Sequence, residues 1–132
     1  MNILFLCVAN SARSQMAEGL GRSIWDSSWN IKSAGSEPSG KVHPGAITAM
    51  QAIDIDISHH TSQSIESLPE EFLRSLDYVI TLCAEEVCPV ILSNAKKLHW
   101  PMPDPAGVTE AEQAASFQKV RDEITMKIRS FQ

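Results

Sequence analysis

The chain has 132 residues, of which 43% are hydrophobic and 20% charged, and its formal net charge is -5. These values predict a single domain over residues 1–132 with a proper core and leave little room for a long disordered segment. The negative charge argues against broad nucleic-acid binding, because no basic surplus neutralises a phosphate backbone. No apolar stretch is long enough to cross a bilayer, and no basic segment precedes the first apolar run, so we expect a cytoplasmic protein without membrane contact.

The first part of the chain alternates between strand and helix patterns. Residues 3–6 form an uninterrupted apolar run, which is typical of a strand covered on both faces. Residues 12–25 carry apolar side chains at helical spacing, so residues 8–11 form a strand-to-helix turn. Residues 29–34, followed by Gly35, predict a second short strand. A strand, a helix and a strand in this order predict a crossover unit.

The middle of the chain is expected to contain one helix between two loops. Residues 36–41 are rich in Ser, Pro and Gly, which indicates a loop. A helix begins at Pro44, which the first helical turn tolerates, and its apolar spacing extends to Ile53. Residues 57–70 are mostly polar and predict a second loop.

Two more strands and a long helix complete the pattern. A short helix over residues 70–75 precedes a strand over residues 78–82, and a fourth strand covers residues 95–100. The last helix presents one apolar face, made of Phe117, Val120, Ile124, Ile128 and Phe131. Strands that alternate with helices imply right-handed crossovers, so the predicted fold class is α/β, with a four-stranded parallel sheet and helices on both faces.

The turn after the first strand holds the motif CVANSAR. A turn that leads directly into a helix directs backbone N–H groups and the helix's positive end at its contents, which favours an anion. Arg13 adds a planar charged fork suited to two oxygens of a tetrahedral oxyanion, and the same field favours the reactive thiolate of Cys7. Ser11 and Ser14 are further donors, and Asn10 tolerates left-handed backbone. The predicted oxyanion-binding residues are Val8, Ala9, Asn10, Ser11, Ala12, Arg13 and Ser14.

Three chemically active side chains are expected at one edge of the sheet. Cys7 and Cys83 each end a strand, and Asp104 lies four residues past the fourth strand. Ligands of such sheets gather at the carboxyl ends of the strands, so these side chains should converge there. From the residues alone, two plainer interpretations stay open: the cysteines can be inert core residues, and Asp104-Pro105 can be a simple turn.

Longer stretches carry a family resemblance. "CVANSARSQMAEG" resembles the phosphate-binding loop of the low-molecular-weight protein tyrosine phosphatase superfamily. The stretches "SAGSEPSGKVHPGAITAM", "DIDISHHTS", "VITLC", "HWPMPDPAG" and "FQKVRDEI" are similar to the thiol-dependent, thioredoxin-coupled arsenate reductases of that superfamily, and the similarity covers nearly the whole chain in order. The resemblance implies a low-molecular-weight phosphatase-like fold and the reduction of arsenate to arsenite.

The resemblance also implies roles for individual residues. Cys7 is the nucleophile, and Asp104 is the general acid. Cys83 then attacks the arsenic-bound sulfur and expels arsenite, and Cys88 resolves the resulting disulfide by exchange. The implied reductant is thioredoxin or a glutaredoxin and low-molecular-weight thiol system, phosphate or sulfate can occupy the same loop, and no cofactor is implied. The expected catalytic residues are Cys7, Arg13, Cys83, Cys88 and Asp104.

Some positions depart from the family pattern. Ala9 and Ala12 stand where relatives often carry Gly and Cys, and Ala9 restricts the loop backbone more than glycine would. Only four residues separate Cys83 from Cys88, which is a short segment for a cysteine relay.

No metal is expected in this chain. Some family members bind potassium through residues matching Asn10, Glu18, Thr61 and an aspartate two positions further on, where this chain has Gln63. The histidines lack cysteine or carboxylate partners at metal-site spacing, so we expect capping or surface roles for His43, His59 and His60. A solvated face is expected for Glu85 and Glu86.

Two other functions are compatible with the motif. A phosphatase acting on phosphotyrosine or a small phosphoester would use Cys7, Arg13 and Asp104 alone. Ala106 disfavours a tyrosine substrate, because phosphatase relatives commonly place an aromatic residue just after the Asp-Pro pair. A non-catalytic oxyanion or arsenic sensor would need the loop but neither the acid nor the additional cysteines.

Overall fold

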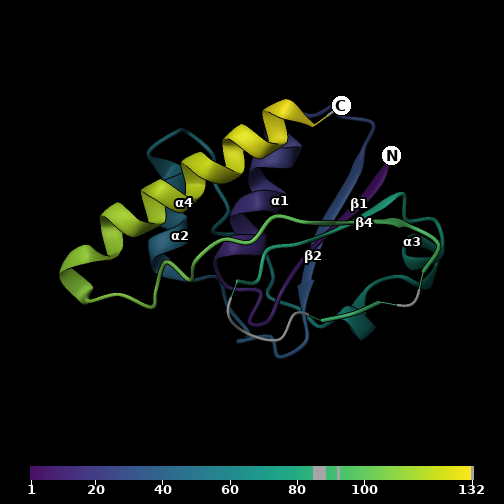
Figure 1. The fold of residues 1–132 in the computed structure, drawn as a ribbon, viewed down its shortest axis with the longest axis horizontal. Helices are drawn as coiled ribbons and strands as arrows, with labels where there is room; N and C mark the ends of the chain where they lie inside the picture. Colours follow the sequence, from purple (N-terminus) through teal and green to yellow (C-terminus); the bar gives the residue numbers. More distant parts are fainter. Residues whose placement is uncertain (85–88, 92, 132) are drawn as a thin grey trace.

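The computed structural model describes residues 1–84, 89–91 and 93–131. The predictions made for Glu85, Glu86 and Cys88 lie outside the described residues. Within the described part, a four-stranded sheet has the order β2-β1-β3-β4, and all neighbouring strands are parallel (Figure 1). This confirms the predicted α/β class. The strands are β1 (Asn2–Cys7), β2 (Asn30–Gly35), β3 (Tyr78–Thr81) and β4 (Lys96–His99).

Helices cover both faces of the sheet, as predicted. Along β1, Ile3 and Phe5 face one core cluster, whereas Leu4 and Leu6 face the other. This alternation buries β1 on both sides and explains its uninterrupted apolar sequence. Helices α1 (Arg13–Ile24), α2 (Pro44–Gln51) and α4 (Glu110–Ser130) gather on the first side, and α3 (Glu70–Arg74) lies apart from them (Figure 1).

Helix α4 buries the apolar face predicted for it. Phe117, Val120, Ile124 and Ile128 are each at most 1% exposed, and Phe131 is half-buried against the same core. No helix in the described ranges has the length and apolar character needed to cross a membrane.

The end of α2 corrects one prediction. The helix stops at Gln51, and Ile53 lies in the following turn with 38% of its surface exposed. The backbone of Asp54 is left-handed, with φ of 63°, and the Ile55 N–H bonds back to the Met50 carbonyl. This turn closes the helix before Ile53, so helical spacing of one apolar residue overestimated its length.

The start of α2 confirms another prediction. His43 caps the helix, because its Nδ1 accepts the Gly45 N–H at 2.9 Å. Its own N–H bonds to the Ser11 carbonyl at 2.8 Å. The capping residue therefore also connects α2 to the turn after β1.

Candidate active site

The turn after β1 lies against β2. Cys7 is 2% exposed and pairs in register with Gly35. A Cβ on Gly35 would lie 2.3 Å from the Val8 carbonyl oxygen, a distance that no side chain tolerates. The absence of a side chain at Gly35 therefore allows the turn to fold closely over the end of β2.

The carbonyl groups of the anion loop, residues 8–14, are held on its outside. Those of Val8, Ala9 and Ser11 accept N–H groups from the backing segment, residues 37–43, at 2.9, 2.9 and 2.8 Å. The Asn10 carbonyl accepts the amide of Gln15 at 3.1 Å. Because N–H and C=O point in opposite directions across a trans peptide, the N–H groups that follow these carbonyls point away from the hydrogen-bonding partners of the carbonyls, on the side where an anion would be bound.

Asn10 determines the curvature of the loop. It is fully buried, and its φ of 48° is left-handed, as the sequence predicts. Its side-chain N–H₂ donates to Ser14 Oγ at 2.7 Å and to Ser33 Oγ at 3.0 Å. Ser14 Oγ in turn lies 2.9 Å from Cys7 Sγ. Either atom of the Ser14–Cys7 pair can donate; Ser14 Oγ, which accepts from Asn10, keeps its own hydroxyl proton and can donate it to a Cys7 thiolate when one forms.

Arg13 connects the anion loop to the other side of the site. Its side chain is largely buried, and Nη1 donates to the Met102 carbonyl at 3.0 Å and to the Leu82 carbonyl at 3.5 Å. Leu82 immediately precedes Cys83, which is fully buried. The arginine therefore bonds to the two segments that carry Cys83 and Asp104.

The segment that carries Asp104 runs beside the end of β3. The Trp100 N–H donates to the Thr81 carbonyl at 2.8 Å, and the Met102 N–H donates to the Leu82 carbonyl at 3.1 Å. Asp104 itself is exposed, and its Oδ1 accepts the Ala106 N–H at 3.0 Å. The carboxylate thus caps a turn, and the fold brings its segment to the edge that also holds Cys7 and Cys83.

Behind the loop, Glu18 and His60 form a buried polar cluster. Glu18 accepts Ser33 Oγ at 2.7 Å and pairs with Arg22 at 3.0 Å. His60 Nδ1 lies 3.1 Å from Gln15 Oε1 and 3.7 Å from Glu18 Oε2, and its side chain is 6% exposed. The surface position expected for His60 is therefore wrong, because the loop after α2 folds its ring inward; His59 is exposed, as predicted.

Burial controls the protonation of His60. Loss of water lowers the pKa of His60, which the Glu18 carboxylate partly opposes and the nearby Arg22 and His59 reinforce. No group of three or more His, Cys, Asp or Glu side chains is arranged to hold a metal ion within the part of the chain that the structure describes.

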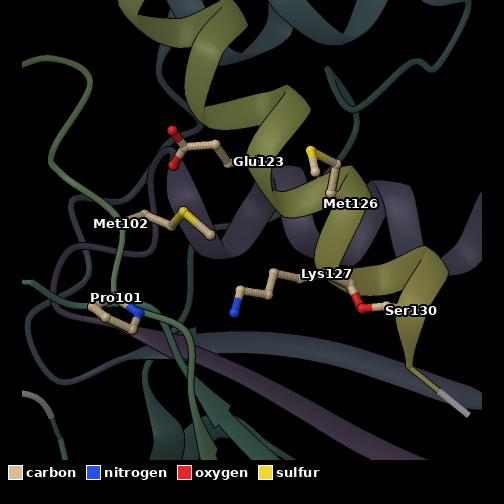
Figure 2. Close-up of a pocket in the computed structure, with 6 residues that line it drawn as sticks. All are labelled: Pro101, Met102, Glu123, Met126, Lys127 and Ser130. Atoms are coloured by element: carbon tan, nitrogen blue, oxygen red, sulfur yellow. The ribbon is translucent and has the colours of Figure 1, made fainter.

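A separate groove of about 450 Å³ lies between α4 and the segment before Asp104. Figure 2 shows the Met102 side chain at one wall and the Lys127 amine directed into the space. The groove is lined by Pro101, Met102, Glu123, Met126, Lys127 and Ser130, none of which belongs to the anion loop. Met102 therefore contacts Arg13 through its carbonyl and forms the groove with its side chain.

Comparisons with known proteins agree with this geometry. The family described as low molecular weight phosphotyrosine protein phosphatase matches residues 2–132. Arsenate reductase 2 of Staphylococcus saprophyticus is 53% identical over 131 residues, which cover 98% of this chain and 94% of that protein.

Solved structures give the same result. An arsenate reductase in the phosphate binding state has a TM-score of 0.78 and 33% identity, with 96% of this chain and 92% of that chain covered. The thioredoxin-dependent arsenate reductase of Corynebacterium glutamicum has a TM-score of 0.72 and 31% identity, covering 96% of this chain and 57% of that chain. The chain therefore belongs to the low molecular weight phosphotyrosine protein phosphatase family, and within it to the arsenate reductases.

Proposed function

We propose that this protein reduces arsenate to arsenite with electrons from thiols. The observation that carries the proposal is the second buried cysteine, Cys83, whose neighbouring carbonyl at Leu82 is bonded by Arg13 of the anion loop. Hydrolysis of a phosphate ester through Cys7 and water needs no second thiol, whereas reduction needs two electrons. The full-length similarity to proteins named arsenate reductase supports the same conclusion.

In the first step, arsenate occupies the centre of the anion loop. Inward N–H groups and Arg13 share its negative charge, as they would for phosphate, because both are tetrahedral oxyanions. The Cys7 thiolate attacks arsenic, and one arsenic–oxygen bond breaks. Asp104 gives a proton to the departing oxygen, which leaves as water; for this, its carboxyl must be protonated, and Oδ2 can carry the proton while Oδ1 keeps the Ala106 N–H.

In the second step, the thiolate of Cys83 attacks the sulfur of Cys7. A disulfide forms between the two cysteines, and the electron pair of the arsenic–sulfur bond stays on arsenic. Arsenic(V) becomes arsenic(III) and leaves as arsenite, while two thiols are oxidised to one disulfide, so the two electrons balance.

In the third step, Cys88 attacks the first disulfide and transfers the bridge to Cys83–Cys88, where an external thiol reduces it. Thioredoxin is the first candidate, because a structural relative is described as thioredoxin-dependent. A glutaredoxin with a low-molecular-weight thiol is the alternative reductant, and a coupled assay separates them. Arsenate-dependent NADPH consumption is measured with each system in turn, and we expect turnover with at least one of them.

A single-turnover experiment tests the relay. Cys88→Ser should release about one arsenite per enzyme and accumulate a Cys7–Cys83 disulfide, found by mapping peptides under non-reducing conditions. Cys83→Ser should release none without added thiol.

Sustained turnover of Cys88→Ser with thioredoxin would instead indicate direct reduction by an external thiol. Arsenate binding without arsenite release by the wild-type protein would identify an oxyanion sensor, and rapid phosphoester hydrolysis a phosphatase.

A further inference from the structure

The residues that match the potassium ligands of some family members lie in the polar cluster behind the anion loop. The matching residues are Asn10, Glu18 and Thr61, with Gln63 in place of an aspartate. A potassium ion needs several oxygen atoms that face a common point and carry enough negative charge. Both conditions are tested by the hydrogen bonds and charges of this chain.

The oxygen atoms of the cluster are already occupied by donors of the protein. The Gln15 amide nitrogen lies 3.1 Å from three oxygens: the carbonyl and side-chain oxygens of Asn10 and the carbonyl of Thr61. Asn10 Oδ1 also accepts the Gln63 N–H at 2.9 Å. The buried amide of Gln15 therefore stands among the oxygen atoms that a cation would otherwise bring together.

Gln63 supplies a second amide to the same cluster. Its Nε2 donates to the Ser33 carbonyl at 3.1 Å, while the hydroxyl of Ser33 donates to Glu18 at 2.7 Å. Gln63 thereby holds the β2 residue that bonds both Asn10 and Glu18. An aspartate at this position would offer only acceptors to the Ser33 carbonyl.

The charges of the cluster are balanced without an ion. Glu18 is the carboxylate of the set, and Arg22 pairs with it at 3.0 Å. His60 faces Glu18 at 3.7 Å, and burial lowers its pKa, so it is neutral at neutral pH. A neutral Gln63 adds no charge, so a further cation at Asn10, Glu18 and Thr61 would share the Glu18 carboxylate with Arg22 and find no second carboxylate at position 63.

We infer that the carboxamides of Gln15 and Gln63 replace a bound cation, and that oxyanion binding by this protein is independent of potassium. Gln63 is the positioning residue: it acts on the anion loop through Ser33 and Asn10 and does not touch the substrate. The residues present do not fit a potassium ion for two reasons. The Gln15 amide occupies the oxygen atoms, and Arg22 already balances the charge of Glu18.

The first test uses the wild-type protein. Phosphate affinity is measured by calorimetry and the melting temperature by scanning calorimetry, in potassium chloride and in choline chloride of equal ionic strength. We expect the phosphate dissociation constants to agree within about twofold and the melting temperatures to coincide. A potassium-specific gain in affinity or melting temperature would overturn the inference. Neither measurement involves a reductant, so its failure is distinguishable from failure of the proposed reductase activity.

The second test introduces the missing carboxylate. Gln63→Asp removes a donor from Ser33 and places a second negative charge beside Glu18, so phosphate binding in choline should weaken about tenfold. Potassium should restore part of that loss, because it compensates the charge of the new carboxylate; for this, the Gln15 amide must give way to the ion at the oxygens of Asn10 and Thr61. Gln63→Ala is the matched control: it loses the same hydrogen bond without adding charge, and potassium should not restore it. Equal responses of the two variants to potassium would refute the role assigned to Gln63.

Discussion

The anion loop and the turn that carries Asp104 belong to the same edge of the sheet and are held very differently. Loop carbonyls are fixed by the backing segment, and the side chains of Asn10 and Ser14 are fully buried. Asp104 is exposed and bonds to its own turn. The difference matches the two tasks that we propose for them, because oxyanion binding requires donors arranged beforehand, whereas an acid must meet an oxygen that arrives with the substrate.

Among the changes considered, replacement of Asn10 in the anion loop should cause the largest loss of stability and of phosphate affinity. Asn10→Ala removes an amide that bonds Ser14 and Ser33 and leaves a Cβ-bearing residue in left-handed backbone without local support. We expect the free energy of unfolding to fall by about 2–4 kcal/mol and phosphate affinity to fall about 100-fold, measured by urea titration and calorimetry.

Asn10→Gly separates the two causes. Glycine adopts the left-handed conformation without steric cost, so it should recover about 1 kcal/mol of the stability lost in Asn10→Ala, while affinity for phosphate stays low. Equal stability of the two variants would show that the backbone of residue 10 carries no strain.

Replacement of Asp104 in the turn that carries it should slow the reaction but leave binding and stability unchanged. Asp104→Asn keeps an acceptor for the Ala106 N–H and preserves the turn, but it provides no acidic proton. Arsenite formation in a single turnover should slow about 100-fold, because general-acid catalysis contributes at least that much. Phosphate affinity and melting temperature should be unchanged. A loss of phosphate affinity would place Asp104 on the binding side of the site.

The sequence predicts the chemistry of both sides better than it predicts their support. The roles predicted for Cys7, Arg13 and Asp104 rest on their residue types, on their positions after strands and on the family resemblance. The backing segment is not recognisable in this way, since it acts through backbone N–H groups that any residue provides. Gly35 is an intermediate case: it ends the predicted strand, but its close approach to Val8 depends on the packing of β1 against β2.

Two of the errors have a common physical origin. Spacing predicts a helical Ile53, and the lack of cysteine or carboxylate partners at metal-site spacing predicts a capping or surface role for His60. In the structure, Ile53 is exposed in the turn after α2, and the chain that follows this turn buries the His60 side chain beside Glu18. The left-handed residue Asp54, which redirects the chain, carries no local signal as clear as glycine. The direction that the chain takes after a helix therefore cannot be predicted from the periodicity and polarity of its residues.

The hydroxyl of Ser14 tests a finer part of the comparison. If its proton stabilises the Cys7 thiolate, Ser14→Ala should slow alkylation of Cys7 by iodoacetamide at pH 7 about tenfold, since a hydrogen bond to a charged group contributes about 1.5–3 kcal/mol. Ser11→Ala, in the same loop, is the matched control and should alter the rate less than twofold, because Ser11 contacts its neighbour His43 through its carbonyl. Equal rates for Ser14→Ala and the wild type would assign Ser14 to packing alone.

The smallest expected effect concerns pH and the support behind the loop. Burial lowers the pKa of His60 in the folded protein, so the unfolded chain takes up a proton near pH 6.5 that the folded chain does not yet bind. Proton uptake therefore stabilises the unfolded state relative to the folded state as pH falls below that value. The free energy of unfolding of the wild type should decrease between about pH 7 and pH 5. The lowered pKa of Asp56, caused by hydrogen bonds from Ser58, acts only at lower pH, around and below its ordinary value of 3.8.

Urea unfolding at pH 7, 6 and 5 measures the slope of the free energy of unfolding against pH. His60→Gln keeps a donor for Gln15 but has no proton to take up, so its stability should change less over the interval than that of the wild type. His59→Gln is the graded comparison: His59 contributes to the lowered pKa of His60, so its replacement should reduce the pH dependence of stability less than His60→Gln does. A slope in His60→Gln equal to that of the wild type would show that the pH response arises elsewhere in the fold and that the cluster supporting the anion loop does not titrate in this range.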